Sequence, residues 1–570
     1  MRADARLLAA LVGLLLAGRG AAEPPPPPEA ATAYALRPPE HARRFMAVTA
    51  NPHATAAALE ILRAGGSAVD AAIAAQMVLG LVEPQSSGLG GGGLMLFFDA
   101  RRQRLAAWDG RETAPLTASA GQLSDAAGRR LEFASAVRDP RAVGAPGLLA
   151  MLGLAHSEAG RLSWARLFVP AIRLAEEGFA VSPRLHGLLA LEGGFADPAA
   201  QALFFDAEGR PWPVGHTLRN PALARSLRLA AAEGPRALHR GELAGLVRDA
   251  VRGDLPADEA DRRGLLGYPD LARYQPLRRE ALCRPYRGYR VCGFPPPSSG
   301  GSTVLAILGI WRQLPAAPVG PVEFIHRFAE AGRLAYADRA ACVGDPMAVP
   351  VPVPVGAMLD ERYLARRAAA IGARAGPPRR AAGLCGEGGE AEDERPSTSH
   401  LSIVDGFGNA VALTSSIEDA FGNRRMAGGF FLNNQLTDFS ETGPNLTAPG
   451  KRPRSSMAPT LVFDRHGLYA VLGSPGGSQI PNFVSQALIG LLDERMDAVE
   501  VVAQARVGSR NGPLEVEQGR LAPAVLEALE ARGHGLREVE MTSGIALIVR
   551  QGRGWVGAAD PRREGTAGGD

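Results

Sequence analysis

Hydrophobic and polar positions along the chain follow two periods, which change over near residue 398. Between about residues 144 and 345, apolar residues recur every three or four positions, as in amphipathic helices. Beyond residue 398, short apolar runs alternate with polar residues and are separated by turns rich in Gly, Asn or Asp, as in β-hairpins. Helical material before this point and an antiparallel sheet that begins at it predict two sheets faced by helices.

The same pattern predicts individual elements on both sides of the change. Helices are expected at 53–63, 68–82, 303–314, 322–338, 481–492 and 498–505. Strands are expected at 94–98, 460–463, 468–472 and 544–549, with a hairpin whose two arms carry Leu401 and Val411.

The first 22 residues have the composition of a secretory signal. Two arginines precede an apolar run over residues 7–18, and small residues follow up to Ala22. The run is too short to span a hydrocarbon core of ~30 Å comfortably. We therefore expect a signal peptide over 1–22, then a proline-rich linker over 23–43, in a periplasmic or secreted protein with no membrane attachment once the signal is removed. An uncleaved anchor is the alternative.

Composition narrows the function classes. Hydrophobic residues make up 46% of the 570 residues and charged residues 21%, which is typical of a globular protein and excludes a disordered or fibrous one. The formal net charge of +3 is small for this length, so nothing indicates a nucleic-acid partner or an anionic membrane surface.

Four cysteines are too few for a disulfide scaffold, and none has the spacing of metal ligands. We therefore predict neither a metal site nor a cofactor. Cys283 and Cys292 flank the stretch 286–289, and a hairpin that turns there would place them opposite each other. A cross-strand disulfide between them is predicted, in keeping with export.

The glycine-rich run 88–93 matches the letters of a dinucleotide-binding fingerprint. In that fingerprint the glycines follow a strand and open a helix. Here they follow a predicted helix and precede the apolar stretch 94–98. We interpret the run as a place where backbones pack tightly beneath a core strand.

The junction between Ser397 and Thr398 carries the candidate chemistry. An acidic stretch of small residues, 383–395, precedes it and is expected to be exposed within a mobile tail over about 374–397, whereas a buried strand follows it. If the chain is cut here, Thr398 gains a free α-amine beside its hydroxyl. Such an amine, with a pKa of roughly 7.7–8.0, can act as the base for that hydroxyl. On local sequence alone, an ordinary strand start is the more common interpretation.

Five further clusters of residues favour the catalytic interpretation of Thr398 over an ordinary strand start. They lie at 108–115, 417–422, 432–438, 451–457 and 473–478. Together with 88–93, 295–301 and the Thr398 junction, they resemble the γ-glutamyltransferase (γ-glutamyltranspeptidase) family in the same order, from about Ala47 to Arg563. Each cluster alone is a weak signal, whereas the ordered set is specific.

The resemblance implies an α/β (α+β) fold, a four-layer αββα sandwich of the N-terminal-nucleophile hydrolases. It implies a precursor, or zymogen, that cuts itself between Ser397 and Thr398. The products would be a large subunit over 44–397 and a small subunit over 398–570, paired as a heterodimer. Thr398 would then take the γ-glutamyl group from glutathione or another γ-glutamyl compound, and water or an amino acid or peptide acceptor would release it.

The resemblance also implies roles for individual residues. Backbone N–H groups of Gly476 and Gly477 would form the oxyanion hole, a feature typically worth roughly 2.7–4 kcal/mol in the transition state. A guanidinium and hydroxyls would hold the substrate α-carboxylate, and a carboxylate with an amide would hold its ammonium. The residues at these positions are, for the carboxylate, Arg111, Ser455 and Ser456, and for the ammonium, Gln435 and Asp438.

Two positions depart from the family pattern. Glu418 stands where many relatives have Asn, and it adds negative charge to the ammonium subsite. Ser416 stands where Thr usually orients the nucleophile, and its hydroxyl can still donate and accept. The stretch 440–449 is shorter than in relatives with a lid, which predicts an open cleft like that of lid-less bacterial members.

Two other functions remain as alternatives. A cephalosporin or glutaryl acylase of the same fold uses the same nucleophile but reads no ammonium group. The presence of Glu418, Gln435 and Asp438 argues against it. A non-catalytic relative that stays uncut is the second alternative, and the presence of Thr398 and Arg111 argues against that one.

Overall fold

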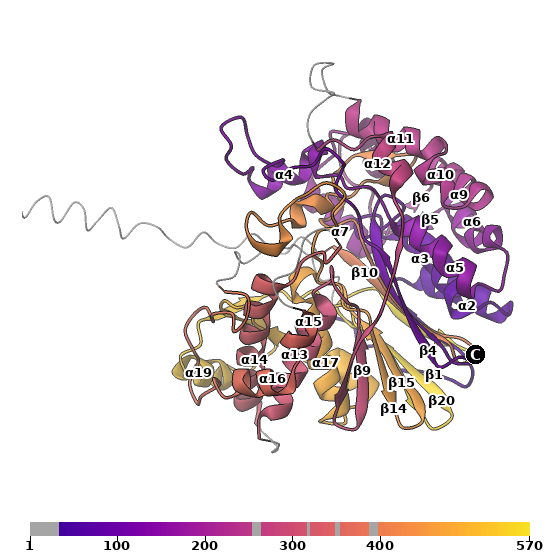
Figure 1. The fold of residues 1–570 in the computed structure, drawn as a ribbon. Coiled ribbons are helices and arrows are strands. Elements are labelled where there is room, and N and C mark those ends of the chain that lie inside the picture. The colour runs from indigo at the N-terminus through magenta and orange to yellow at the C-terminus, as the bar shows by residue number, and fades with distance from the viewer. Residues whose placement is uncertain (1–33, 254–263, 316–319, 348–353, 387–396) are drawn as a thin grey trace, which may run out of the picture.

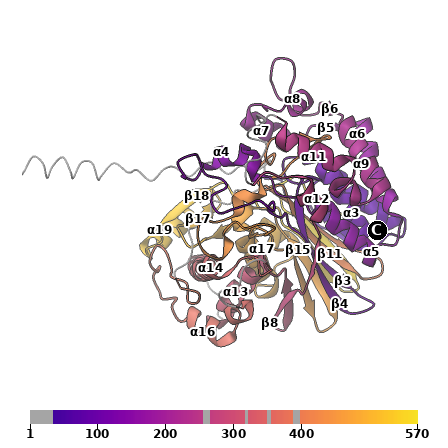
Figure 2. The same cartoon turned by 45° about the horizontal axis from the view of Figure 1, so that its top comes forward.

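The computed structural model describes residues 34–253, 264–315, 320–347, 354–386 and 397–570. Two seven-stranded antiparallel sheets lie face to face, and a layer of helices covers the outer side of each (Figures 1 and 2). This is the four-layer arrangement that the resemblance implied.

The first sheet brings together strands from both sides of the Ser397–Thr398 junction. Its order is β21 (Thr566–Gly569), β2 (Met46–Thr49), β10 (Thr398–Val404), β11 (Ala410–Ser416), β3 (Gly92–Asp99), β4 (Arg104–Gly110) and β7 (Leu277–Arg279). β10 and β11 come after the junction and lie in the middle, with β2 and β3 from before the junction on either side. The two parts of the chain are therefore interleaved within one sheet.

The second sheet is also built from both parts. Its order is β1 (Glu40–Ala42), β20 (Gly554–Ala559), β19 (Ala546–Gln551), β15 (Gly467–Gly473), β14 (Thr460–Asp464), β9 (Tyr289–Gly293) and β8 (Leu282–Tyr286). Side chains on β3 show how the layers are filled. Leu94, Leu96 and Phe98 point between the sheets, whereas Met95 and Phe97 join the core under the helices, so this strand is apolar at every position from Leu94 to Phe98.

One helix layer packs on the first sheet. It consists of α2 (Pro52–Arg63), α3 (Ala68–Val82), α5 (Leu148–Ala159), α6 (Val169–Glu177), α7 (Pro183–Glu192), α9 (Pro221–Glu233), α10 (Arg236–His239), α11 (Glu242–Arg252) and α12 (Tyr268–Arg273). α3 lies at its centre, between the sheet and α6. It is buried on all sides and begins with a capping box between Ser67 and Asp70.

The other helix layer packs on the second sheet. It consists of α13 (Gly300–Gln313), α14 (Pro321–Cys342), α16 (Glu361–Ala368), α17 (Ile480–Leu492) and α18 (Ala498–Ala503). Shorter elements fill the periphery: α4 (Phe133–Arg138), α8 (Pro198–Phe204), α15 (Val355–Met358), α19 (Pro523–Ala531), β5 (Phe179–Ala180), β6 (Thr217–Leu218), β12 (Met426–Ala427), β13 (Phe430–Phe431), β16 (Val507–Gly508), β17 (Leu514–Glu517) and β18 (Leu536–Val539). The six helices predicted from periodicity are all present, with ends within about four residues of those expected.

Two predicted boundaries were wrong. The folded chain begins inside the predicted linker 23–43, because β1 pairs with β20 at the edge of the second sheet. The predicted tail over 374–397 is not wholly an exposed tail. Arg380 forms an ion pair with the buried Glu330, and Ser397 is fully buried. Residues 387–396 and the predicted signal peptide lie outside the described residues.

Two disulfides are present. Cys283 on β8 lies opposite Cys292 on β9 and is bonded to it, in the hairpin arrangement that the spacing predicted. Cys342, the last residue of α14, is bonded to Cys385. Periodicity gave no sign of the second pair, which ties the segment leading to the junction onto the helix layer.

In the described part of the chain, no helix combines the length and hydrophobicity needed to cross a bilayer. Within those same residues, no group of three or more His, Cys, Asp and Glu side chains is arranged to hold a metal ion.

The glycine-rich run 88–93 makes close backbone contacts near the junction. A Cβ on Gly90 would overlap the carbonyl oxygen of Phe431, and one on Gly91 would overlap that of Ser416. Gly91 therefore lets the loop before β3 lie directly against the end of β11, and Gly90 lets it lie against the end of β13, as expected for close backbone packing.

We expect Gly91→Ala to lower the free energy of unfolding by about 1–3 kcal/mol, because the added Cβ would overlap backbone atoms rather than the end of a flexible side chain. Thermal unfolding of the purified variant measures this. Gly187→Ala is the matched control, since a Cβ there meets nothing within 4 Å in α7, and it should stabilise by up to about 1 kcal/mol. Equal melting temperatures for Gly91→Ala and the unchanged chain would contradict the assignment.

Candidate active site

Thr398 is the first residue of the central strand β10, and only 4% of its surface is exposed. It pairs with Ser416 at the end of β11. Because β10 is held by strands on both sides, the position of Thr398 is set by the sheet.

Three hydrogen bonds fix the Ser397–Thr398 peptide. The Ser416 hydroxyl donates to the carbonyl oxygen of Ser397 at 2.7 Å and accepts from the Thr398 hydroxyl at 3.4 Å. The Ser397 hydroxyl donates to the carbonyl oxygen of Gln85, in the loop after α3. The carbonyl that would be attacked is thus polarised and held next to the Thr398 hydroxyl.

Ser416 is itself held by the turn that follows β11. The backbone N–H of Glu418 donates to the Ser416 hydroxyl at 2.9 Å. Glu418 has a φ of 82°, in the left-handed region that is rare for a residue with a side chain. Its carboxylate accepts a hydrogen bond from Asn434, which fixes the turn from the other side.

The predicted substrate residues converge on one pocket with Thr398. Eleven residues line it: Arg111, Thr398, Ser416, Glu418, Gln435, Asp438, Ser455, Ser456, Met457, Gly477 and Ile480. Of the predicted catalytic and substrate-binding residues, only Gly476 does not line the pocket. Its φ of 133° and the Phe483 ring against it identify a position where a side chain would be strained and crowded.

Opposite charges face each other across this pocket. Arg111 is 1% exposed and forms an ion pair with Asp438, and it also donates to the backbone carbonyls of Pro453 and Arg454. The Gln435 amide donates to the same oxygen of Asp438 at 2.6 Å. In the uncut chain the predicted carboxylate site and ammonium site therefore neutralise each other.

The pocket is nearly closed in this state. Its volume of about 20 Å³ is room for one water molecule. The segment 440–449 contributes none of the lining residues, and its Asn445 donates to the backbone carbonyl of Asp438 from outside. An open cleft without a lid stays a prediction for the cut protein.

Sequence patterns missed the residues that support the two serines. Arg339, near the end of α14, donates to the Ser456 hydroxyl at 2.8 Å and to the Ser299 hydroxyl at 2.7 Å. The Ser299 hydroxyl in turn donates to the carbonyl oxygen of Ser455. The stretch 295–301 was the available signal for this contact, but its partner on a distant helix was not visible.

Glu112, next to Arg111, was also missed. It is fully buried, and neither carboxylate oxygen has a hydrogen-bond partner within the structure. Burial raises the pKa of Glu112 to about 8, although the neighbouring Arg111, at 3.8 Å, acts to lower that pKa. The Glu112 side chain is therefore protonated at neutral pH and adds no negative charge to the pocket.

Two facing antiparallel sheets between helix layers, with a buried threonine at the head of a central strand, define an N-terminal-nucleophile hydrolase fold. The family model for γ-glutamyltranspeptidase matches residues 54–569. The chain belongs to the γ-glutamyltranspeptidase family.

Its relatives carry more than one name. The chain is 36% identical to the acylase ACY 1 proenzyme of Pseudomonas sp. strain SE83, covering 93% of this chain and 94% of that one. It is 34% identical to the glutathione hydrolase proenzyme of Escherichia coli strain K12, covering 92% and 91%. The crystal structure of cephalosporin acylase from Bacillus halodurans superposes with a TM-score of 0.83 at 26% identity, covering 97% and 99%. The family is thus established, while its substrate branch is not fixed by similarity.

The Glu112 carboxyl predicts a pH-dependent stability. Its pKa on folding, about 8, lies above the value of 4.5 in the unfolded chain, so its contribution is fully present below pH 4.5 and is lost as pH rises toward 8. Replacing it by Gln should make unfolding free energy less dependent on pH in this window, by up to about 1.4 kcal/mol per pH unit.

The measurement is chemical denaturation of Thr398→Ala with and without Glu112→Gln between pH 5 and pH 8. The uncleavable background keeps the covalent state of the two chains the same. Parallel curves of unfolding free energy against pH would show that Glu112 does not titrate in this way.

Proposed function

We propose that this protein is a γ-glutamyl transferase and hydrolase that becomes active by cutting its own chain between Ser397 and Thr398. The observation that carries the proposal is that Thr398, Ser416 and the predicted residues for a carboxylate and an ammonium line one pocket. An amino-acid head group needs both subsites, and they lie beside the nucleophile.

Self-cleavage would begin with attack of the Thr398 hydroxyl oxygen on the carbonyl carbon of Ser397. The bond between that carbon and the Thr398 nitrogen breaks, so the acyl group moves to the hydroxyl oxygen and the nitrogen becomes an amine. Water then hydrolyses the ester, which leaves a carboxylate on Ser397 and a free hydroxyl and amine on Thr398. The hydrogen bond from Ser416 to the Ser397 carbonyl supports this proposal, because it would stabilise the developing negative charge.

Acyl transfer would use the same hydroxyl a second time. The α-amine of Thr398 removes its proton as the oxygen attacks the γ-carbonyl carbon of the donor, and the proton passes to the leaving amine. The negative oxygen is stabilised by the N–H groups of Gly476 and Gly477. Water or the amine of an acceptor amino acid or peptide then attacks the ester and regenerates Thr398.

Selectivity for a γ-glutamyl group would come from the charged pocket. Arg111 with Ser455 and Ser456 binds the α-carboxylate, and Asp438 with Gln435 binds the α-ammonium. A bound head group replaces the direct Arg111–Asp438 ion pair by two separate ion pairs, so the two buried charges stay compensated. Glu418 adds a second carboxylate to the ammonium side.

Acylase activity is the second candidate, and the 36% identity to the acylase ACY 1 proenzyme favours it. A glutaryl group has the same carbon chain and terminal carboxylate but no ammonium. It would leave Asp438 without the cation that a glutamyl donor supplies.

The proposed γ-glutamyl transferase is also expected to be exported, to the periplasm or outside the cell, and to consist of a heterodimer of the two subunits.

Thr398→Ala should give one unbroken chain without γ-glutamyl activity, because the attacking hydroxyl is gone. A denaturing gel and N-terminal sequencing measure this, and the unaltered protein should give two bands, the smaller beginning at Thr398. Ser399→Ala is the matched control, since it removes the neighbouring hydroxyl and should still be cut. Two bands from Thr398→Ala would refute the nucleophile.

Asp438→Asn should narrow the preference for glutamyl over glutaryl donors. In the unaltered protein we expect kcat/KM for a γ-glutamyl anilide to exceed kcat/KM for the glutaryl anilide by about 100-fold. In Asp438→Asn this ratio should be about 10- to 100-fold smaller. Release of the aniline, followed by absorbance, gives both constants. A protein that prefers the glutaryl compound before any substitution is an acylase instead.

A further inference from the structure

Arg563 contacts the backbone of Thr398 but does not line the pocket. It lies just before β21, is 2% exposed, and its Nη1 donates to the backbone carbonyl oxygen of Thr398 at 3.3 Å. Its Nε and Nη2 donate to the carbonyl oxygen of Thr542 at 3.0 and 2.8 Å. No sequence pattern pointed to this residue.

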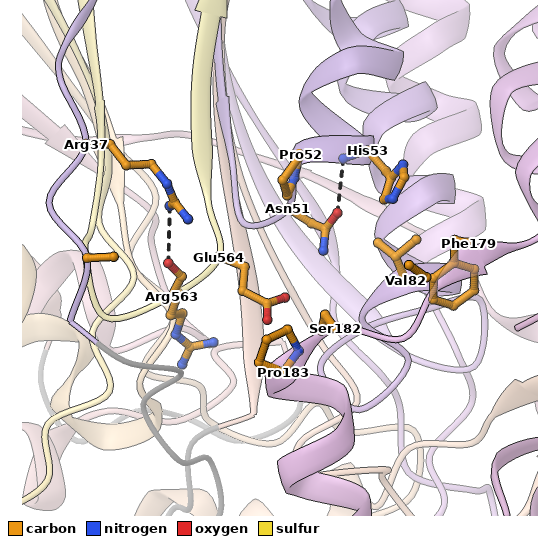
Figure 3. Close-up of a pocket in the computed structure, with 12 residues that line it drawn as sticks. Arg37, Asn51, Pro52, His53, Val82, Phe179, Ser182, Pro183, Arg563 and Glu564 are labelled. Carbon is orange, nitrogen blue, oxygen red and sulfur yellow. Dashed lines mark hydrogen bonds between the residues drawn. The ribbon is translucent and has the colours of Figure 1, made fainter. Parts of the chain in front are cut away.

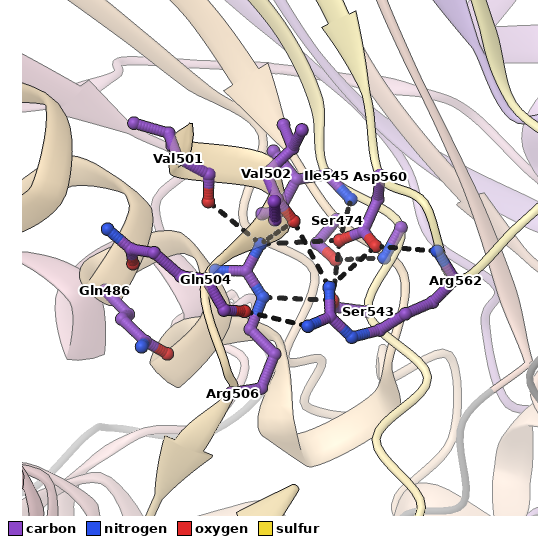
Figure 4. A network of polar contacts seen from close by, with 12 residues as sticks. Ser474, Gln486, Val501, Val502, Gln504, Arg506, Ser543, Ile545, Asp560 and Arg562 are labelled. Carbon is purple, nitrogen blue, oxygen red and sulfur yellow. Dashed lines mark hydrogen bonds and ion pairs between the residues drawn. The ribbon is translucent and has the colours of Figure 1, made fainter. Parts of the chain in front are cut away.

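The turn that carries Arg563 is anchored by a buried polar network (Figure 4). The Asp560 carboxylate accepts from the Ser543 hydroxyl at 2.6 Å and from Arg562 at 2.9 Å, and it contacts Arg506 at 3.4 Å. Because these groups are fully or nearly fully buried, the residue that follows Arg562 has little freedom to move.

Gly544 lies close to both the stem of Arg563 and Pro475. A Cβ on Gly544 would lie 2.7 Å from both the Arg563 Cδ and the ring of Pro475. Pro475 directly precedes Gly476. The backbone of Arg563 is held in turn by Arg37, which donates to its carbonyl oxygen at 3.3 Å across a neighbouring cavity (Figure 3).

The Arg563 charge lies close to the future α-amine. The nitrogen and carbonyl oxygen of one residue are about 3 Å apart, so the guanidinium Nη1 is no more than about 7 Å from the Thr398 nitrogen. A positive charge at this range in a buried site disfavours the ammonium form of the amine, and so lowers its pKa.

The other charged groups around this end of β10 act in both directions. Glu83, at the end of α3, accepts from the Ser399 hydroxyl at 3.4 Å, and burial lowers the pKa of His400 to about 3, so it carries no charge. The other charged residues that line the pocket are Arg111, Glu418 and Asp438, while the neighbouring Glu112 is protonated. The buried network at Asp560 adds four charged residues that pair with one another: Arg506, Glu517, Asp560 and Arg562. Among these groups the carboxylates outnumber the cations even when Arg563 is counted, so removing the Arg563 charge would raise the amine pKa further.

We propose that Arg563 is a positioning residue for the nucleophile: it holds the Thr398 carbonyl, and its charge keeps the α-amine in the base form near neutral pH. The inference rests on the proposed self-cleavage, which creates that amine.

The test measures the pKa of the Thr398 α-amine in cut protein. Competitive acetylation with acetic anhydride at a series of pH values, read by mass spectrometry of the peptide that begins at Thr398, gives this value without any substrate. Arg563→Met should raise the pKa by about one pH unit. The acid limb of kcat/KM for the γ-glutamyl anilide should move up by the same amount.

Arg563→Lys keeps the charge, and Arg37→Met removes a nearby cation that holds the same segment without reaching Thr398. Both should leave the amine pKa within a few tenths of a pH unit. An unchanged pKa in Arg563→Met, or an equal shift in Arg37→Met, overturns the proposal.

Maturation failures are also informative. If Arg563→Met stays uncut while Arg563→Lys is cut, the rescue by a second cation supports the proposal. If both variants stay uncut but melt at the same temperature as Thr398→Ala, the charge at position 563 is not what cutting requires, and the proposal falls. A wild-type chain that is never cut removes the proposed function itself. Cut protein with the expected amine pKa shift but no γ-glutamyl turnover leaves this inference standing and rejects only the donor.

Discussion

The antiparallel pairing of β10 with β11 is the constraint on which the rest of the site depends. It sets Thr398 opposite Ser416. The Ser416 hydroxyl therefore donates to the Ser397 carbonyl oxygen, and the Thr398 hydroxyl donates to the Ser416 hydroxyl. Side chains alternate between the faces of a strand, so a slip of one residue would turn Thr398 away from the pocket. The flanking strands β2 and β3 and the loop at Gly91 prevent that slip.

Arg111 and Asp438 compensate each other's charge before any substrate arrives. Arg111 and Asp438 are both buried, and an isolated charge in either place would be costly. Protonation of Glu112 removes a further negative charge that the site could not compensate.

Much of this structure was accessible from the sequence, and the reasons differ between its parts. Amphipathic stretches such as 53–63 predicted their helices because periodicity records which face is buried. The family resemblance located the pocket residues because the motifs stand in order, although their spacing alone was weak. Contacts such as Arg339 to Ser456 and Arg563 to Thr398 left no local pattern, since each joins segments more than one hundred residues apart.

Boundaries were the weaker part. The edge strand β1 was missed because three residues carry too short an alternation to be read as a strand. The segment 374–386 looked like a tail because its small and charged residues have no apolar period. Its fixed contacts come from single tertiary interactions, the ion pair of Arg380 and the disulfide of Cys385, which composition does not reveal.

The interleaving of the first sheet has a consequence for the assembled enzyme. If the chain is cut as proposed, β10 and β11 of one product stay paired with β2 and β3 of the other, so separating the products would expose unpaired strand edges. Halves of different molecules would then not exchange in a mixed population. Each large subunit would stay with the small subunit made from the same precursor, and the two would separate only when the whole first sheet unfolds.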